Sequence, residues 1–85
     1  MPYAMSDLIV PINSRARNLN KKIGLKIRLA RVANGLKQKD LAKHLQVCQR
    51  TISSYENGTN GVDAIALFKI AKFLKQNVDY FSPLE

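Results

Sequence analysis

The residues of this chain that are best suited to binding are its cations, and most of them lie in one segment. Between residues 15 and 50 the chain carries eleven Lys and Arg residues against one acid, Asp40, which is a net charge of +10. The whole 85-residue chain has a net charge of +8, so the segments on either side contribute almost nothing. A basic block of this kind suits a polyanion, with nucleic acid first and an anionic membrane second, and it is also compatible with a plain solvated surface.

Catalytic and metal-binding residues are scarce. A structural zinc site needs four N or S ligands, whereas the chain has one His and one Cys. We find no nucleophile beside a base, no paired carboxylates and no glycine loop that would cradle a phosphate. We therefore expect no enzyme activity, no cofactor, no metal and no small-molecule ligand.

The length of the chain allows one domain, and its lone Cys48 excludes an internal disulfide. No apolar run reaches the roughly 20 residues that cross a bilayer, and no signal peptide is evident. We expect a cytoplasmic, nucleoid-associated protein with no membrane partner.

The elements that position the basic residues are predicted to be helices, preceded by an N-terminal arm. Pro2 and Pro11 interrupt residues 1–18, and the apolar patch at 8–12 is too short for a helix of its own, which favours an edge strand or an apolar strap. From residue 19 the period is helical. Ile23, Ile27 and Ala30 form one stripe of a first helix, which Asn34 and Gly35 end. We predict an arm at 1–18 and a domain at 19–85.

Four more helical segments are expected in that domain. They lie at 38–45, at about 49–56, from an N-cap at Asp63 through about 75, and in a short last turn around 79–81. The predicted fold class is all-α, a compact bundle of five short helices. The helices at 38–45 and 49–56 are joined by a very short turn, so they must cross steeply. A steep pair in a small basic domain, here at about 38–56, is typical of a helix-turn-helix.

Two runs of residues make this prediction more specific. Gly35-Leu36-Lys37-Gln38-Lys39-Asp40-Leu41-Ala42 is followed, after a gap, by Val47-Cys48-Gln49-Arg50-Thr51-Ile52-Ser53-Ser54-Tyr55-Glu56-Asn57-Gly58. Their order and spacing resemble the Cro/repressor-type (XRE) helix-turn-helix family, which has a lambda-repressor-like fold. The resemblance covers about residues 23–82.

The resemblance implies a role for several polar residues. Gln49 and Arg50 open the second helix of the motif, where family members contact base edges; Gln pairs well with adenine and Arg with guanine. Ser53 and Ser54 are further base-reading candidates on its outer face. Gln38 matches a residue that binds a phosphate and braces the reading helix. The other phosphate-binding candidates are Lys37, Lys39, Lys43, Thr51, Asn57 and Thr59, although each lysine is equally compatible with a solvated surface.

The resemblance also implies that Arg31 and Glu56 form a partly buried, structural ion pair. Three positions depart from the family pattern. Lys37 stands where Ser or Thr caps a helix, a loss of roughly 1 kcal/mol unless another group replaces that cap. Gln46 replaces a glycine, so a left-handed backbone there would be strained. Cys48 replaces another capping Ser or Thr; it is a candidate redox switch or simply a tolerated small residue.

A second apolar stripe, Leu25, Leu29 and Val32, lies beside the core stripe of the first helix. Exposure of such a stripe is costly, so we predict that the arm packs on it, in the same subunit or in a partner. The C-terminal residues Tyr80, Phe81 and Leu84 are the second candidate for a dimer surface.

Together these features predict a sequence-specific, double-stranded DNA-binding transcriptional regulator, a repressor of bacterial or phage origin. A homodimer would place two reading helices about 34 Å apart on a near-palindromic operator. One alternative is an antitoxin that represses its own operon and binds a toxin partner. The other is a protein-interaction module that has kept the fold without DNA binding.

Overall fold

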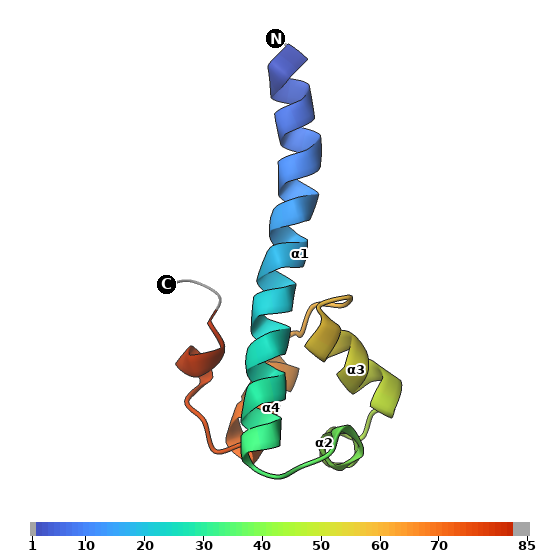
Figure 1. The fold of residues 1–85 in the computed structure, drawn as a ribbon, viewed down its shortest axis with the longest axis vertical. Coiled ribbons are helices and arrows are strands. Elements are labelled where there is room, and N and C mark those ends of the chain that lie inside the picture. Colours follow the sequence, from blue (N-terminus) through green and yellow to red (C-terminus); the bar gives the residue numbers. More distant parts are fainter. Residues whose placement is uncertain (1, 83–85) are drawn as a thin grey trace.

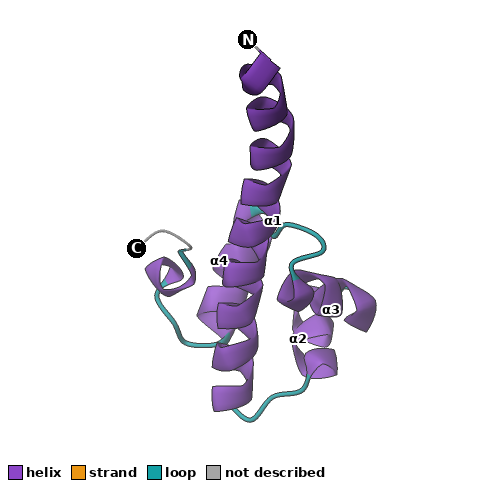
Figure 2. Cartoon of the chain, turned by 45° about the horizontal axis from the view of Figure 1, so that its top comes forward, coloured by secondary structure: helices purple, strands orange, loops and turns teal. Residues whose placement is uncertain are grey.

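The computed structural model describes the backbone of residues 2–82 and the side chains of residues 18–82. It contains four α-helices and one 3₁₀ helix, namely α1 (Pro2–Ala33), α2 (Gln38–Leu45), α3 (Gln49–Asn57), α4 (Ala64–Phe73) and η1 (Val78–Phe81) (Figure 1). Within residues 2–82 there is no strand (Figure 2). The all-helical class is confirmed, but five α-helices were one too many, because the last turn closes with the tighter 3₁₀ bonding that short segments use.

The predicted strand or strap at the N-terminus is wrong, because residues 2–18 belong to the same helix as residues 19–33. The N-terminal half of α1 projects beyond the other helices (Figure 1). The sequence carries a signal for this helix, since apolar types recur every three or four residues back from Ile23. Those positions are Met5, Ile9, Ile12, Ala16 and Leu19. Pro11 removes one backbone donor, which costs about 3 kcal/mol, but it does not end the helix. The proposed boundary at residue 18 falls inside α1 and stays a prediction.

The C-terminal end of α1 is fixed by Asn34 and Gly35. Gly35 adopts φ = 69°, the left-handed conformation that favours glycine, and the N–H of Leu36 donates to the Arg31 carbonyl at 3.1 Å. The Asn34 amide donates to the carbonyls of Ala30 at 2.8 Å and Leu74 at 3.1 Å. The end of the first helix is therefore tied to the end of α4, forty positions away in the sequence.

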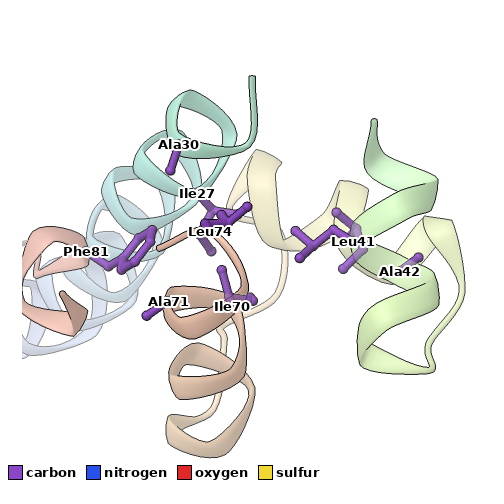
Figure 3. Packing of buried hydrophobic residues seen from close by; sticks show 9 residues of the cluster. Ile27, Ala30, Leu41, Ala42, Ile70, Ala71, Leu74 and Phe81 are labelled. Atoms are coloured by element: carbon purple, nitrogen blue, oxygen red, sulfur yellow. The ribbon is translucent and has the colours of Figure 1, made fainter. Parts of the chain in front are cut away.

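The core is formed by all five elements. Its buried apolar residues are Ile27, Ala30, Leu41, Ala42, Ile52, Ile70, Ala71, Leu74 and Phe81, and eight of them are labelled in Figure 3. The predicted core stripe of the first helix is confirmed, because Ile27 and Ala30 are buried and Ile23 packs against the cluster, as do Leu45, Tyr55 and Leu67. Phe81 is fully buried in its own subunit, so its assignment to a dimer surface is wrong. Leu84 lies outside the described residues.

The crossing of α1 and α3 depends on a glycine. A Cβ atom at Gly24 would lie 2.6 Å from the Glu56 carbonyl oxygen and closer still to that of Tyr55. Both obstacles are backbone atoms, so no side-chain rotation relieves them. Gly24 therefore allows α1 to lie directly against the C-terminal end of α3.

The second apolar stripe of α1 is uncovered. Leu25, Leu29 and Val32 are 53%, 52% and 59% exposed. The arm does not fold back onto them within the subunit, because it continues α1 away from them. That part of the prediction is wrong, and coverage by a partner's arm stays a prediction. No helix among the described residues has the length and apolar character needed to cross a membrane.

Candidate nucleic-acid interface

The two helices of the predicted motif are α2 and α3, joined by residues 46–48. Gln46 has φ = 59° and ψ = 44°, which is the left-handed backbone expected at this position. It ends α2, and the N–H of Val47 then donates to the Ala42 carbonyl at 3.0 Å. The left-handed backbone of Gln46 redirects the chain between the two helices. The conformational strain of a non-glycine residue in this region therefore falls at the turn of the motif.

The N-terminus of α2 has one of the two hydrogen bonds of a capping box. Lys37 occupies the N-cap and has no side-chain acceptor, as predicted. The Asp40 carboxylate supplies the other half of a capping box, because it accepts from the Lys37 backbone N–H at 2.8 Å. Asp40 is the single acid of the basic segment, and its position in the first turn also suits the helix dipole.

The start of α3 is open to solvent. Cys48 occupies its N-cap, makes no side-chain capping bond and is exposed. Gln49 and Arg50 follow it and are also exposed. The Gln49 amide donates weakly to the Gln38 side-chain oxygen at 3.4 Å, whereas Arg50 has no hydrogen bond or ion pair with another described residue. Two of the four predicted base-reading residues, Gln49 and Arg50, therefore lie next to each other at the exposed start of α3.

The opposite end of α3 is held by the cluster of Arg31, Gln38 and Glu56, called here the Glu56 cluster. Arg31 donates through Nε and Nη2 to the two Glu56 carboxylate oxygens, at 2.6 and 3.1 Å. Gln38 donates to Glu56 Oε1 at 3.0 Å, and Arg31 Nη1 reaches the Leu36 carbonyl at 2.8 Å. Glu56 is 7% exposed. Its carboxylate joins α1, α2 and α3, so it is a structural residue that orients α3 rather than a surface acid.

The other predicted site residues differ in exposure. Thr51, Ser53 and Ser54 are half-buried, and Asn57 and Thr59 are exposed. The Asn57 amide lies 3.4 Å from Ser53 Oγ, which links a base-reading candidate to a phosphate-binding one. The exposed side chains of Lys37, Lys39 and Lys43 form no ion pair or hydrogen bond within the part of the chain that the structure describes.

A hollow at the C-terminal end of α3 adds a residue that the sequence did not single out. It has a volume of about 350 Å³ and is lined by Lys21, Asn57, Gly58 and Thr59. Gly58 has φ = 77°, and a Cβ atom there would lie 2.7 Å from the Lys21 Cα atom. The close approach places Lys21 in the same hollow as the two predicted phosphate-binding residues. Lys21 belongs to the basic block, but the other residues that line the hollow are 36 to 38 positions away in the sequence, so spacing alone could not identify it.

Comparison with known proteins agrees with this geometry. The family model described as helix-turn-helix matches residues 27–81, and the chain belongs to this family. The predicted XRE-type resemblance is thereby confirmed. The family defines a class of DNA-binding transcriptional regulators and not of enzymes.

Individual relatives carry the same description. The chain is 33% identical over 69 residues to an uncharacterized HTH-type transcriptional regulator of Rickettsia conorii, covering 81% of this chain and 55% of the relative. It is 36% identical over 64 residues to an uncharacterized transcriptional regulator in the ATPase CF(0) region of Rhodospirillum rubrum, covering 75% and 59%. The chain thus spans little more than half the length of the curated relatives it matches.

A solved structure is also similar. The restriction-modification controller protein C.AhdI from Aeromonas hydrophila superposes with a TM-score of 0.68 and is 26% identical, covering 73% of this chain and 94% of that one. About a quarter of this chain therefore lies outside the part that superposes.

Proposed function

We propose that this protein binds double-stranded DNA sequence-specifically and represses transcription by occupying an operator. The observation that carries the proposal is the contrast between the two ends of α3. Its start presents Gln49 and Arg50 to solvent, while its end is fixed by the Glu56 cluster. A helix that is held rigidly at one end and offers an amide and a guanidinium at the other suits direct recognition in a major groove.

Phosphate contacts are proposed on both sides of the reading helix. Lys37, Lys39 and Lys43 lie at or in α2, before the turn, and Gln38 keeps its bracing position beside them. Lys21, Asn57 and Thr59 line the hollow beyond the other end of α3. Groups on both sides of an inserted helix can hold the two phosphate backbones that border a groove, which fixes register without specifying sequence.

The operator-bound form is proposed to be a homodimer. The projecting half of α1 supports this, because the apolar types at residues 5, 9, 12, 16 and 19 follow the alternating four- and three-residue spacing of paired helices. Residues 5–19 carry Asp7, Arg15 and Arg17, a net charge of +1, so charge repulsion between two copies of this segment is small. Two reading helices about 34 Å apart would then meet successive major grooves.

Selection of bound duplexes from a random DNA pool tests this function. We expect a near-palindromic site whose half-sites are about 10 base pairs apart, centre to centre. A pool that shows no enrichment over the starting sequences contradicts sequence-specific binding. Enrichment of a single, unrepeated half-site contradicts the dimer and leaves the DNA-binding function standing.

A further inference from the structure

The exposed apolar stripe of α1 has no role in the proposed DNA contacts. Leu25, Leu29 and Val32 follow the spacing i, i+4, i+7, so they lie along one side of the helix. Each is more than half exposed, whereas Ile27 and Ala30 on the other side of α1 are buried in the core. Single exposed apolar residues are common, but three in register form a continuous strip of the kind that a partner helix covers.

Cations border this stripe. At about 100° per residue, Lys22 lies on one side of Leu25 and Arg28 on the other. Both cations are exposed, and neither has an ion pair or hydrogen bond with any other described residue. Lys26 is engaged differently, since its Nζ donates to the Ser82 carbonyl at 2.9 Å and lies 6.0 Å from the centre of the Tyr80 ring. The stripe is therefore apolar along its centre and positive along both edges.

This charge pattern discriminates among the possible occupants. A second copy packed on the stripe by two-fold symmetry would bring Arg28 next to its own equivalent, and residues 18–33 carry five cations and no acid to offset this repulsion. Nucleic acid would pair with the cations but would leave the three apolar side chains without a complementary surface. A helix with an apolar stripe and acidic edges satisfies both features.

We propose that the α1 stripe is a docking surface for an acidic amphipathic helix of another protein. The partner helix would present apolar residues at three- and four-residue spacing toward Leu25, Leu29 and Val32. Its flanking Asp or Glu residues would meet Lys22 and Arg28. This interaction goes beyond the proposed DNA binding and does not depend on it.

A pair of synthetic peptides tests the proposal. The probe is an 18-residue helix with Leu at positions i, i+3, i+4 and i+7 and Glu at the flanking positions, and the matched peptide has Lys in place of Glu. Fluorescence anisotropy with the full chain should show at least tenfold tighter binding of the Glu peptide. Leu29→Ser should weaken that binding tenfold or more. Arg28→Glu should weaken the Glu peptide and strengthen the Lys peptide.

The chain offers a matched control in Ile65, which is 69% exposed on α4. Ile65→Ser should leave peptide binding unchanged, and Leu29→Ser should retain the parent's melting temperature and DNA binding. Equal binding of the Glu and Lys peptides overturns the proposal. So does an equal loss of Glu-peptide binding in Leu29→Ser and Ile65→Ser. So does concentration-dependent self-association that Leu29→Ser abolishes, because the occupant is then a second copy. Binding to phosphatidylglycerol vesicles that depends on Leu29 overturns it in favour of a membrane.

Discussion

Arg31 and Glu56 are joined by a 2.6 Å contact between Nε and Oε2, across 25 positions of sequence. The side chain of Glu56 is 2% exposed and that of Arg31 is 11% exposed, so this ion pair is largely removed from water. It connects the last turn of α1 to the end of α3. The orientation of α3 therefore depends on a residue of α1, which lies outside the helix-turn-helix pair.

Replacement of Glu56 by Ala should destabilise the fold strongly. It leaves the Arg31 guanidinium without its carboxylate partner, and breaking a buried pair in this way costs about 3–5 kcal/mol. Urea unfolding measures the loss. Asp40→Ala is the matched control, because it removes one exposed capping carboxylate and should cost about 1 kcal/mol. If the two variants lose similar stability, the structural role of the Glu56 cluster is wrong.

Cys48→Ser should stabilise the protein by about 1 kcal/mol. Cys48 occupies the N-cap of α3 without a side-chain bond, and a serine oxygen accepts from the free N–H groups of the first turn. The gain appears as a higher midpoint of urea unfolding, with an unchanged dependence of the unfolding free energy on urea concentration. Cys48→Ala offers no acceptor and should show no gain. A Ser variant that is no more stable than the Ala variant contradicts this reading of the N-cap.

Gln46→Gly should also be stabilising, by about 1 kcal/mol. Gln46 has φ = 59°, a conformation in which a Cβ atom is strained and glycine is not. Gln76 is an exposed glutamine whose φ is not positive, so Gln76→Gly should bring no gain. The melting temperatures of the two variants test this expectation. A loss of stability in Gln46→Gly would show that the turn is not strained.

Gly24→Ala should cost several kcal/mol, because the new Cβ atom meets two backbone carbonyl oxygens of α3 and the helices must separate. Gly61→Ala is the control, since the nearest atom there is a side-chain oxygen of Asn20 at 3.2 Å, which can move. Denaturant unfolding compares the two. A Gly24→Ala variant as stable as Gly61→Ala contradicts the close packing of α1 on α3.

The sequence was most informative where turn chemistry and helical spacing agree. Helix α2 was predicted at its observed bounds and α3 within one residue, because Gly35, the short turn at 46–48 and Gly58 mark the ends of both. The unusual residues Lys37, Gln46 and Cys48 also occupy the capping and turning positions expected of them.

The sequence-based prediction failed where two local signals conflict, and where a contact joins residues that are far apart in the sequence. Pro11 favours an arm without a helix, although the apolar spacing on both sides of it is helical. The approach of Lys21 to Gly58 depends on how α1 crosses α3, which Gly24 permits and which no short motif specifies. The Asp40 contact that restores half of the α2 cap was likewise visible only in the structure.

Binding of Arg50→Ala and Lys39→Ala to a selected operator and to an unrelated duplex tests base recognition by α3 most directly. Arg50→Ala should lose about 1–3 kcal/mol on the operator and little on the unrelated duplex, so its sequence preference falls. Lys39→Ala should weaken both duplexes alike and reduce the slope of log K against log salt by about one. If Arg50→Ala keeps the parent's preference for the operator, recognition by the start of α3 is contradicted.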